Sequence, residues 1–96
     1  MGRALAAAIG VASIAAAAVA SAEPPAGAAA CSGCHPTSVR VTSPVPRLTG
    51  VDRAVIVKAM QDFRSGQRIA TVMDRIAKGF TDDEIQAIAA WYASQK

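Results

Sequence analysis

The second half of the chain carries apolar residues at the three-to-four spacing of an α-helix. Between residues 51 and 63, one such face consists of Val51, Val55, Ala59 and Phe63, with Ile56 and Met60 beside it. Ser65 and Gly66 follow this stretch, and glycine is common where a helix ends. The pattern therefore predicts a helix over residues 51–63 that stops at Ser65 and Gly66.

Two further helices are predicted towards the C-terminus. A short one covers about residues 71–78 and is closed by Gly79. Thr81 and Glu84 have the spacing of a capping box, in which each side chain accepts a hydrogen bond from the other residue's amide. The last helix should therefore begin here and run to about Ser94. Its apolar stripe, expected in the core, consists of Ile85, Ile88, Ala89 and Tyr92, with Trp91 beside it.

The stretch before these helices is expected to be mostly irregular. A short helix can form from Ala26 to Ala30 and leads into the cysteines. Residues 36–50 read as a surface loop, because each of their prolines removes an amide donor and fixes the backbone. No stretch alternates with period two and no segment repeats. The expected fold class is all-α, in a single domain.

Residues 1–22 have the features of an export signal that is cleaved. Arg3 precedes a long run of Ala, Val and Ile, and Ala20, Ser21 and Ala22 form a small-residue cleavage site. A retained membrane anchor is less favoured, because this Ala-dominated run falls short of the roughly 20 strongly apolar residues that a membrane span needs. We expect residues 23–96 to form a periplasmic domain without stable membrane insertion.

The size and charge of the chain limit the classes of function that it can have. Removing residues 1–22 from the 96 leaves 74 residues, and chains below roughly 80 residues seldom fold on apolar burial alone, so a bound cofactor is expected. The net charge is +3, and the basic residues lack interleaved aromatic residues, which makes nucleic acid an unexpected partner. A solvated face is favoured, and docking to an acidic redox partner is the alternative. These basic residues are Arg40, Arg47, Arg53, Arg64, Arg68 and Arg75.

Cys31, Cys34 and His35 form the CxxCH pattern of c-type haem attachment. Two cysteines one helical turn apart can each form a thioether with the vinyl groups on one side of a porphyrin, and the adjoining histidine then binds the iron. The small residues Ser32 and Gly33 let the backbone run close to the haem edge. The sequence therefore predicts one covalently attached haem c.

Three other uses of the cysteine pair are less favoured. A thiol-exchange pair of the thioredoxin type needs a βαβ unit, and the pattern shows none. A disulfide between Cys31 and Cys34 leaves His35 unexplained and closes a loop too short to constrain the unfolded chain much. A zinc site needs a second ligand pair, whereas the chain has one histidine and two cysteines.

A thioether commonly binds the second side of the iron in haem electron carriers. Met73 is favoured over Met60 for this role. Met60 lies on the apolar face of a regular helix, where methionine more often fills the core, whereas Met73 follows a polar, Gly-containing stretch. The alternative is an open sixth site, as in a catalytic or gas-binding haem protein.

Over nearly all of residues 23–96, the chain resembles the class I c-type cytochromes of the short bacterial type. The shared pattern is CxxCHP, then a Pro-x-Leu-x-Gly loop, here residues 46–50, and then a methionine segment. The resemblance implies a small fold wrapped around one haem, with the iron bound by His35 and Met73. It also implies that the carbonyl of Pro46 accepts the Nδ1 proton of His35 and that Leu48 packs on the haem.

Within this class, residues 73–84 are most similar to the cytochrome subunit of flavocytochrome c sulfide dehydrogenase. In that family a flavoprotein oxidises sulfide and passes electrons singly to the haem subunit. The resemblance implies single-electron transfer from such a flavoprotein to a further acceptor, without catalysis by this chain. The alternative is a freely diffusible periplasmic carrier in a respiratory or photosynthetic chain. Some members of the subunit family carry two haem motifs, whereas this chain has one.

Overall fold

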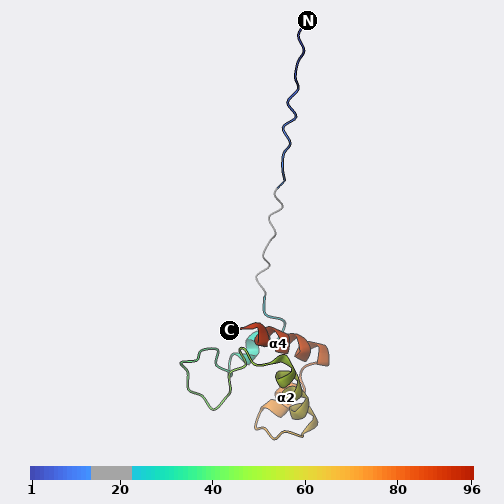
Figure 1. Ribbon diagram of the computed structural model, residues 1–96. Coiled ribbons are helices and arrows are strands. Elements are labelled where there is room, and N and C mark those ends of the chain that lie inside the picture. Colours follow the sequence, from blue (N-terminus) through green and yellow to red (C-terminus); the bar gives the residue numbers. More distant parts are fainter. Residues whose placement is uncertain (14–22) are drawn as a thin grey trace.

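Two helices of 13 residues each, α2 (Arg53–Ser65) and α4 (Asp82–Ser94), pack against each other and organise the fold (Figure 1). The computed structural model describes residues 1–13 and 23–96. A short helix, α1 (Ala28–Cys31), packs on α4, and another, α3 (Met73–Ala77), packs on α2. No residue of the described ranges lies in a strand, so the expected all-α class is confirmed for this part of the chain.

The predicted export signal lies only partly within the described residues. Residues 1–13 form neither helix nor strand, and the expected cleavage site at Ala20, Ser21 and Ala22 lies outside the described ranges. None of the helices in the described ranges is both long enough and apolar enough to cross a membrane.

The ends of α2 are set by local hydrogen bonds and backbone geometry. Asp52 precedes the helix, and its carboxylate accepts a hydrogen bond of 2.8 Å from the amide of Ala54. Gly66 ends it with φ of 81°, a left-handed conformation that side chains disfavour. Gly66 was expected at this end, but the helix starts two residues later than the apolar pattern suggests, because Asp52 is the cap.

The start of α4 is the capping box that the sequence predicts. The Thr81 hydroxyl accepts from the amide of Glu84 at 3.2 Å, and the Glu84 carboxylate accepts from the amide of Thr81 at 3.0 Å. The hydrogen bond from the Thr81 amide, followed by one with the Thr81 side chain, holds the pKa of Glu84 below its ordinary value. The first turn of α4 is therefore fixed by residues that are neighbours in sequence.

The core lies between α1, α2 and α4. The expected stripe of α4 is buried at all four positions. On α2, the expected face is wrong at Val55, which is 59% exposed. Ile56, expected beside that face, is buried, and so is Val57, which was not expected there. Both neighbouring stripes of α2 are apolar, and the packing of α4 decides which one is covered. The buried cluster consists of Ala28, Ile56, Val57, Ile85, Ile88, Ala89 and Tyr92.

The long loop is anchored to the last helix. Residues 36–50 contain no helix or strand, as the prolines predict. At the end of the loop, the amide of Gly50 donates to the carbonyl of Tyr92 at 2.9 Å. Gly50 has φ of 74°, and a Cβ there would lie 3.3 Å from the carbonyl oxygen of Gln95. A residue without a side chain thus lets the loop approach the backbone of α4 closely.

Candidate functional site

The two cysteines lie one turn apart at the end of α1. Cys31 is the last residue of the helix, and its carbonyl accepts from the amides of Cys34 at 3.2 Å and His35 at 2.9 Å. The amide of Gly33 donates to the carbonyl of Ala30 at 3.1 Å. These bonds continue the helical turn through the motif. The turn therefore places both sulfur atoms and the imidazole at one end of α1.

The cysteine thiols are free and differ in their surroundings. Cys34 is exposed, whereas Cys31 is half-buried and packs against the core. Burial raises the pKa of the Cys31 thiol, although a backbone hydrogen bond acts in the opposite direction. A raised pKa disfavours, at this cysteine, the thiolate that thiol exchange requires.

His35 has a defined hydrogen-bond partner in the proline-rich loop. Its Nδ1 atom lies 2.6 Å from the carbonyl oxygen of Pro46, so the contact that the family resemblance implies is present. A carbonyl can only accept, and the proton must therefore be on Nδ1. The lone pair of Nε2 is then free to bind a metal, which is the usual arrangement of metal-binding histidines.

The two candidate methionines differ in what they contact. Met60 lies on α2 and packs against the buried cluster as a partly buried side chain. Met73 is the first residue of α3, is also half-buried, and is not among the residues that pack on that cluster. Met60 thus has a structural explanation in the core, and Met73 has none in the described part of the chain.

Leu48 is also placed by the structure. It is half-buried and packs against the buried cluster, close to where the loop returns to α4. This position explains an apolar side chain by core packing alone. Contact between Leu48 and a haem stays a prediction.

The elements that carry these residues are held apart from one another. In residues 23–96, α1 packs on α4 and α3 packs on α2, but α1 and α3 do not pack against each other. Three apolar side chains within four residues of Met73 in the sequence are exposed: Ile69 at 96%, Val72 at 54% and Ile76 at 39%. Exposed apolar side chains beside Met73 fit a site that an apolar group completes.

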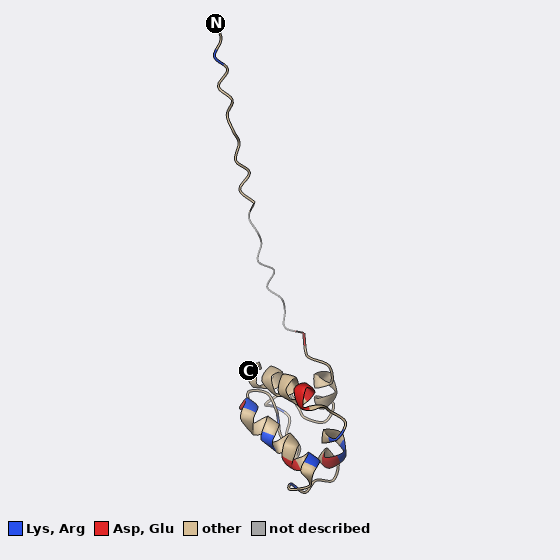
Figure 2. Cartoon of the chain, turned by 90° about the vertical axis from the view of Figure 1, so that its right-hand side faces the viewer, with Lys and Arg blue, Asp and Glu red and all other residues tan. Residues whose placement is uncertain are grey.

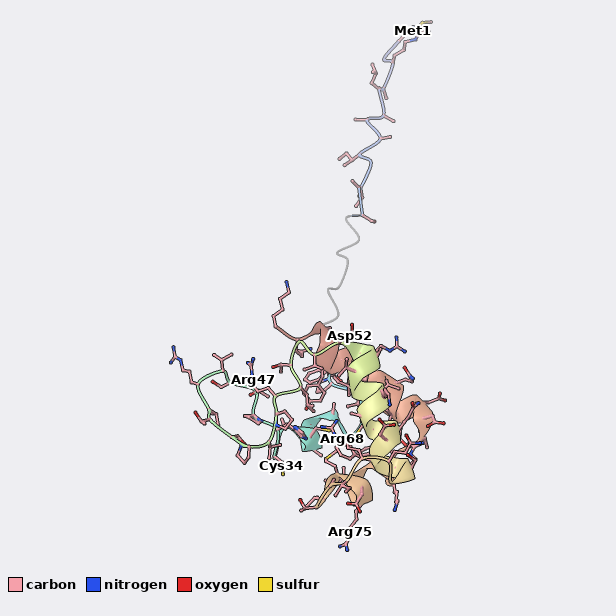
Figure 3. The ribbon with its side chains drawn as sticks, turned by 60° about the horizontal axis from the view of Figure 1, so that its bottom comes forward. Met1, Cys34, Arg47, Asp52, Arg68 and Arg75 are labelled. Atoms are coloured by element: carbon pink, nitrogen blue, oxygen red, sulfur yellow. The ribbon has the colours of Figure 1, made fainter. Side chains whose placement is uncertain are left out.

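Charged residues are spread over the surface. Figure 2 shows the basic residues distributed along α2 and the segment that follows it, and acidic residues at the start of α4. Figure 3 shows Cys34 and Arg75 towards the lower end of the folded region and Asp52 towards its upper end. The guanidinium carbon of Arg68 lies 4.8 Å from the centre of the Phe63 ring, and Arg68 is otherwise exposed. The distribution agrees with the expected solvated face.

One basic residue has a role that the sequence did not reveal. The guanidinium of Arg64 donates to the backbone carbonyl of Phe80 at 2.7 Å and also contacts the carboxylate of Asp82. The helical pattern gives Arg64 only as one of several arginines. A sequence signal for this contact is missing, because a backbone carbonyl is present at every residue.

Comparison with known proteins identifies the family. No protein-family model matches the chain. It is similar to the cytochrome subunit of sulfide dehydrogenase of Chlorobaculum tepidum, with 41% identity over 64 residues, 67% of this chain and 58% of the relative. It is similar to the thiosulfate dehydrogenase electron acceptor of Stutzerimonas stutzeri, with 38% identity over 65 residues, 66% of this chain and 30% of the relative. The chain thus spans less than two thirds of either relative.

A third relative is covered almost completely. The chain is 36% identical to cytochrome c-554(548) of Halomonas halodenitrificans over 70 residues, which are 69% of this chain and 84% of the relative. In this chain, Cys31 and Cys34 belong to the CxxCH motif of c-type haem attachment. The chain therefore belongs to the class I c-type cytochromes, whose cofactor is covalently attached haem c, and it is similar to the cytochrome subunit of sulfide dehydrogenase.

Proposed function

We propose that residues 23–96 fold around one haem c, which Cys31 and Cys34 tether and His35 and Met73 bind at the iron. The bond from His35 to Pro46 is the observation that carries this proposal, because it leaves Nε2 free in the residue that follows two free cysteines one turn apart. Haem iron so bound supplies one-electron chemistry. The chain would be an electron carrier and would not itself transform a substrate.

The residues present fit the cofactor. Two thiols one turn apart match the two vinyl groups on one side of a porphyrin, and Cys34 is accessible to it. The carbonyl of Pro46 fixes the plane of the imidazole and increases its electron donation, as second-shell partners of metal-bound histidines do. Exposed Val72 and Ile76 flank Met73 and would be covered by the ring, which excludes water.

Met73 is proposed as the second axial ligand because Met60 is already used by the core. A thioether favours the ferrous state and raises the reduction potential. With His35 and Met73 both bound to the iron, no site for a substrate would remain there, and electron transfer would be favoured over the alternative of a catalytic or gas-binding haem.

The proposed electron donor is a flavoprotein that oxidises sulfide, and the electron then passes to a further acceptor. Similarity to the cytochrome subunit of sulfide dehydrogenase supports this route. A second candidate is a freely diffusible carrier in a respiratory or photosynthetic chain. The 84% coverage of cytochrome c-554(548) favours it, because that relative is little longer than the matched region.

Residues 1–22 are proposed to direct export to the periplasm and to be removed there. Arg3, the apolar run and the small residues at 20–22 support this assignment. Covalent haem attachment also needs free thiols at Cys31 and Cys34, which the structure retains.

Expression of the full chain in a host with haem-attachment machinery tests the proposal. Purified periplasmic protein should be coloured and should have the mass of residues 23–96 plus one haem that denaturation does not release. A matched His35→Ala variant should lose the native iron coordination. Colourless protein with the mass of the bare polypeptide would contradict the proposal.

The donor is tested by stopped-flow mixing with a flavoprotein sulfide dehydrogenase and sulfide. Rapid reduction, together with co-purification of the two proteins, supports the subunit role. Slow reduction and purification as a free monomer support the diffusible carrier.

A further inference from the structure

Both ends of the segment that carries Met73 are held at the last turn of α2. At its start, the amides of Gly66 and Arg68 donate to the carbonyls of Phe63 at 3.4 Å and Asp62 at 3.1 Å. At its end, the guanidinium of Arg64 reaches the carbonyl of Phe80, sixteen positions along the chain. Residues 66–80 thus form a loop whose two ends meet at the end of one helix.

Of the two contacts of Arg64, the one to Phe80 is the stronger anchor. Asp82 is 77% exposed, and ion pairs in water contribute little. The side chain of Arg64 is only 30% exposed, and a charged donor to a half-buried carbonyl makes a stronger bond than a neutral one. Arg64 therefore closes the loop mainly through the backbone of Phe80.

Phe80 is also fixed from the other side, by α1. Its ring lies over Gly27, where a Cβ would come within 2.5 Å of the Phe80 Cε1 atom. Gly27 stands directly before α1, which ends at Cys31. Phe80 is consequently held by its backbone to α2 and by its ring to the helix that presents the cysteines.

We propose that Arg64 is a positioning residue for the iron: by fixing Phe80, it holds the loop closed and keeps the sulfur of Met73 on the metal. This inference rests on the proposed ligation by Met73. A loop that is anchored at both ends loses less conformational entropy when Met73 binds the iron. The anchor at Phe80 therefore strengthens the bond between Met73 and the iron, although Arg64 does not contact Met73. Release of Phe80 weakens that bond.

The test measures how readily imidazole displaces methionine from the ferric iron of the holoprotein. Arg64→Met removes every donor and keeps the apolar stem, and Arg64→Gln replaces the charged guanidinium with a shorter, neutral amide. Both should bind imidazole about tenfold more tightly than the native protein, the size of effect expected for one charge-assisted hydrogen bond. The ferric spectrum without imidazole should stay that of the native protein.

Arg68→Gln is the matched control, because it removes the same charge from an exposed side chain of the same segment and costs only the surface stacking on Phe63. Its imidazole affinity should stay within about twofold of the native value, since surface charges contribute little. Arg64→Lys keeps one charged donor and should restore most of the native resistance to imidazole. If one of the two Arg64 truncations fails to fold, the other decides.

Equal imidazole affinities in the native, Arg64→Gln, Arg64→Met and Arg68→Gln proteins would overturn the role of Arg64. Met73→Ala separates this result from a failure of the proposed ligation. If Met73→Ala leaves the ferric spectrum unchanged, then Met73 is not a ligand and the inference fails with it. If Met73→Ala changes the spectrum while the Arg64 variants bind imidazole like the native protein, only the role of Arg64 is lost.

Discussion

Tyr92 in α4 donates its hydroxyl hydrogen to the backbone carbonyl of Ala28 in α1, and this hydrogen bond is buried. The two residues are 64 positions apart. The contact fixes the short helix that ends at Cys31 to the last helix, and within residues 23–96 the side chain of Tyr92 is the largest one fully buried. The orientation of the cysteine motif therefore depends on the last helix.

Tyr92→Phe should lower the free energy of unfolding by about 1–3 kcal/mol. The substitution keeps the ring but leaves the carbonyl of Ala28 buried without its donor, and an unsatisfied buried group costs about that much. Chemical denaturation of the holoprotein measures the effect. Ser94→Ala is the control, because it removes an exposed hydroxyl and should change stability by less than about 0.5 kcal/mol. Equal stabilities of Tyr92→Phe and native protein would show that the bond is not important.

Stability should also fall at alkaline pH because of Tyr92. Burial raises the pKa of Tyr92 above its ordinary value of about 10. At pH values below the pKa of Tyr92 in the unfolded state, the phenol is neutral in both states, and its stabilising contribution to folding is fully present. This contribution is lost as the pH rises from the unfolded-state pKa through the folded-state pKa. Denaturation midpoints between pH 8 and pH 11 should show this fall, and Tyr92→Phe should reduce it. The same alkaline slope in both proteins would rule Tyr92 out as its source.

Gly27→Ala should destabilise the protein more than Gly66→Ala. Both glycines have positive φ, 86° and 81°, so alanine carries the same backbone cost of about 1–2 kcal/mol at each. Only at Gly27 does the new methyl group meet the ring of Phe80, and this overpacking adds about 1–3 kcal/mol. Thermal unfolding of the two holoproteins compares them. A Gly66→Ala variant as unstable as Gly27→Ala would mean that the contact with Phe80 is unimportant.

Met73→Ala should change the reduction potential, whereas Met60→Ala should change the stability. Loss of Met73 should lower the reduction potential, open a coordination position and allow carbon monoxide to bind quickly to the ferrous protein. Loss of Met60 should leave the potential nearly unchanged and cost about 2 kcal/mol of stability, because Met60 packs on the buried cluster. Redox titration and denaturation of both variants test the assignment. A large change of potential in Met60→Ala, with none in Met73→Ala, would exchange the two roles.

The parts of the fold that were predictable depend on residues close together in sequence. Thr81 and Glu84 define the start of α4 because their hydrogen bonds join neighbours, and Gly66 ends α2 through its own backbone. The buried face of α2 was not predictable, because Val55 and Val57 are equally apolar and only the packing of α4 distinguishes them. Sequence periodicity indicates a helix better than it indicates which side of a helix is covered.

The site shows the same division. Cys31, Cys34 and His35 are recognisable because attachment chemistry needs them at fixed spacing, and the partner of His35 followed from the family likeness. Arg64 was not recognisable, because it bonds to a backbone carbonyl of the distant Phe80. Contacts to the main chain leave no trace in the identity of the partner residue.

The absence of packing between α1 and α3 in residues 23–96 has a mechanical consequence. The separation of Cys31 from Met73 depends on how α2 and α4 pack, because α1 packs on α4 and α3 packs on α2. Arg53 and Gln86 join these long helices by hydrogen bonds of 3.1 and 2.7 Å at a place remote in sequence from either motif. Substitutions at the contact between α2 and α4 should therefore change the separation between the two motifs, as substitutions of residues that face the porphyrin would.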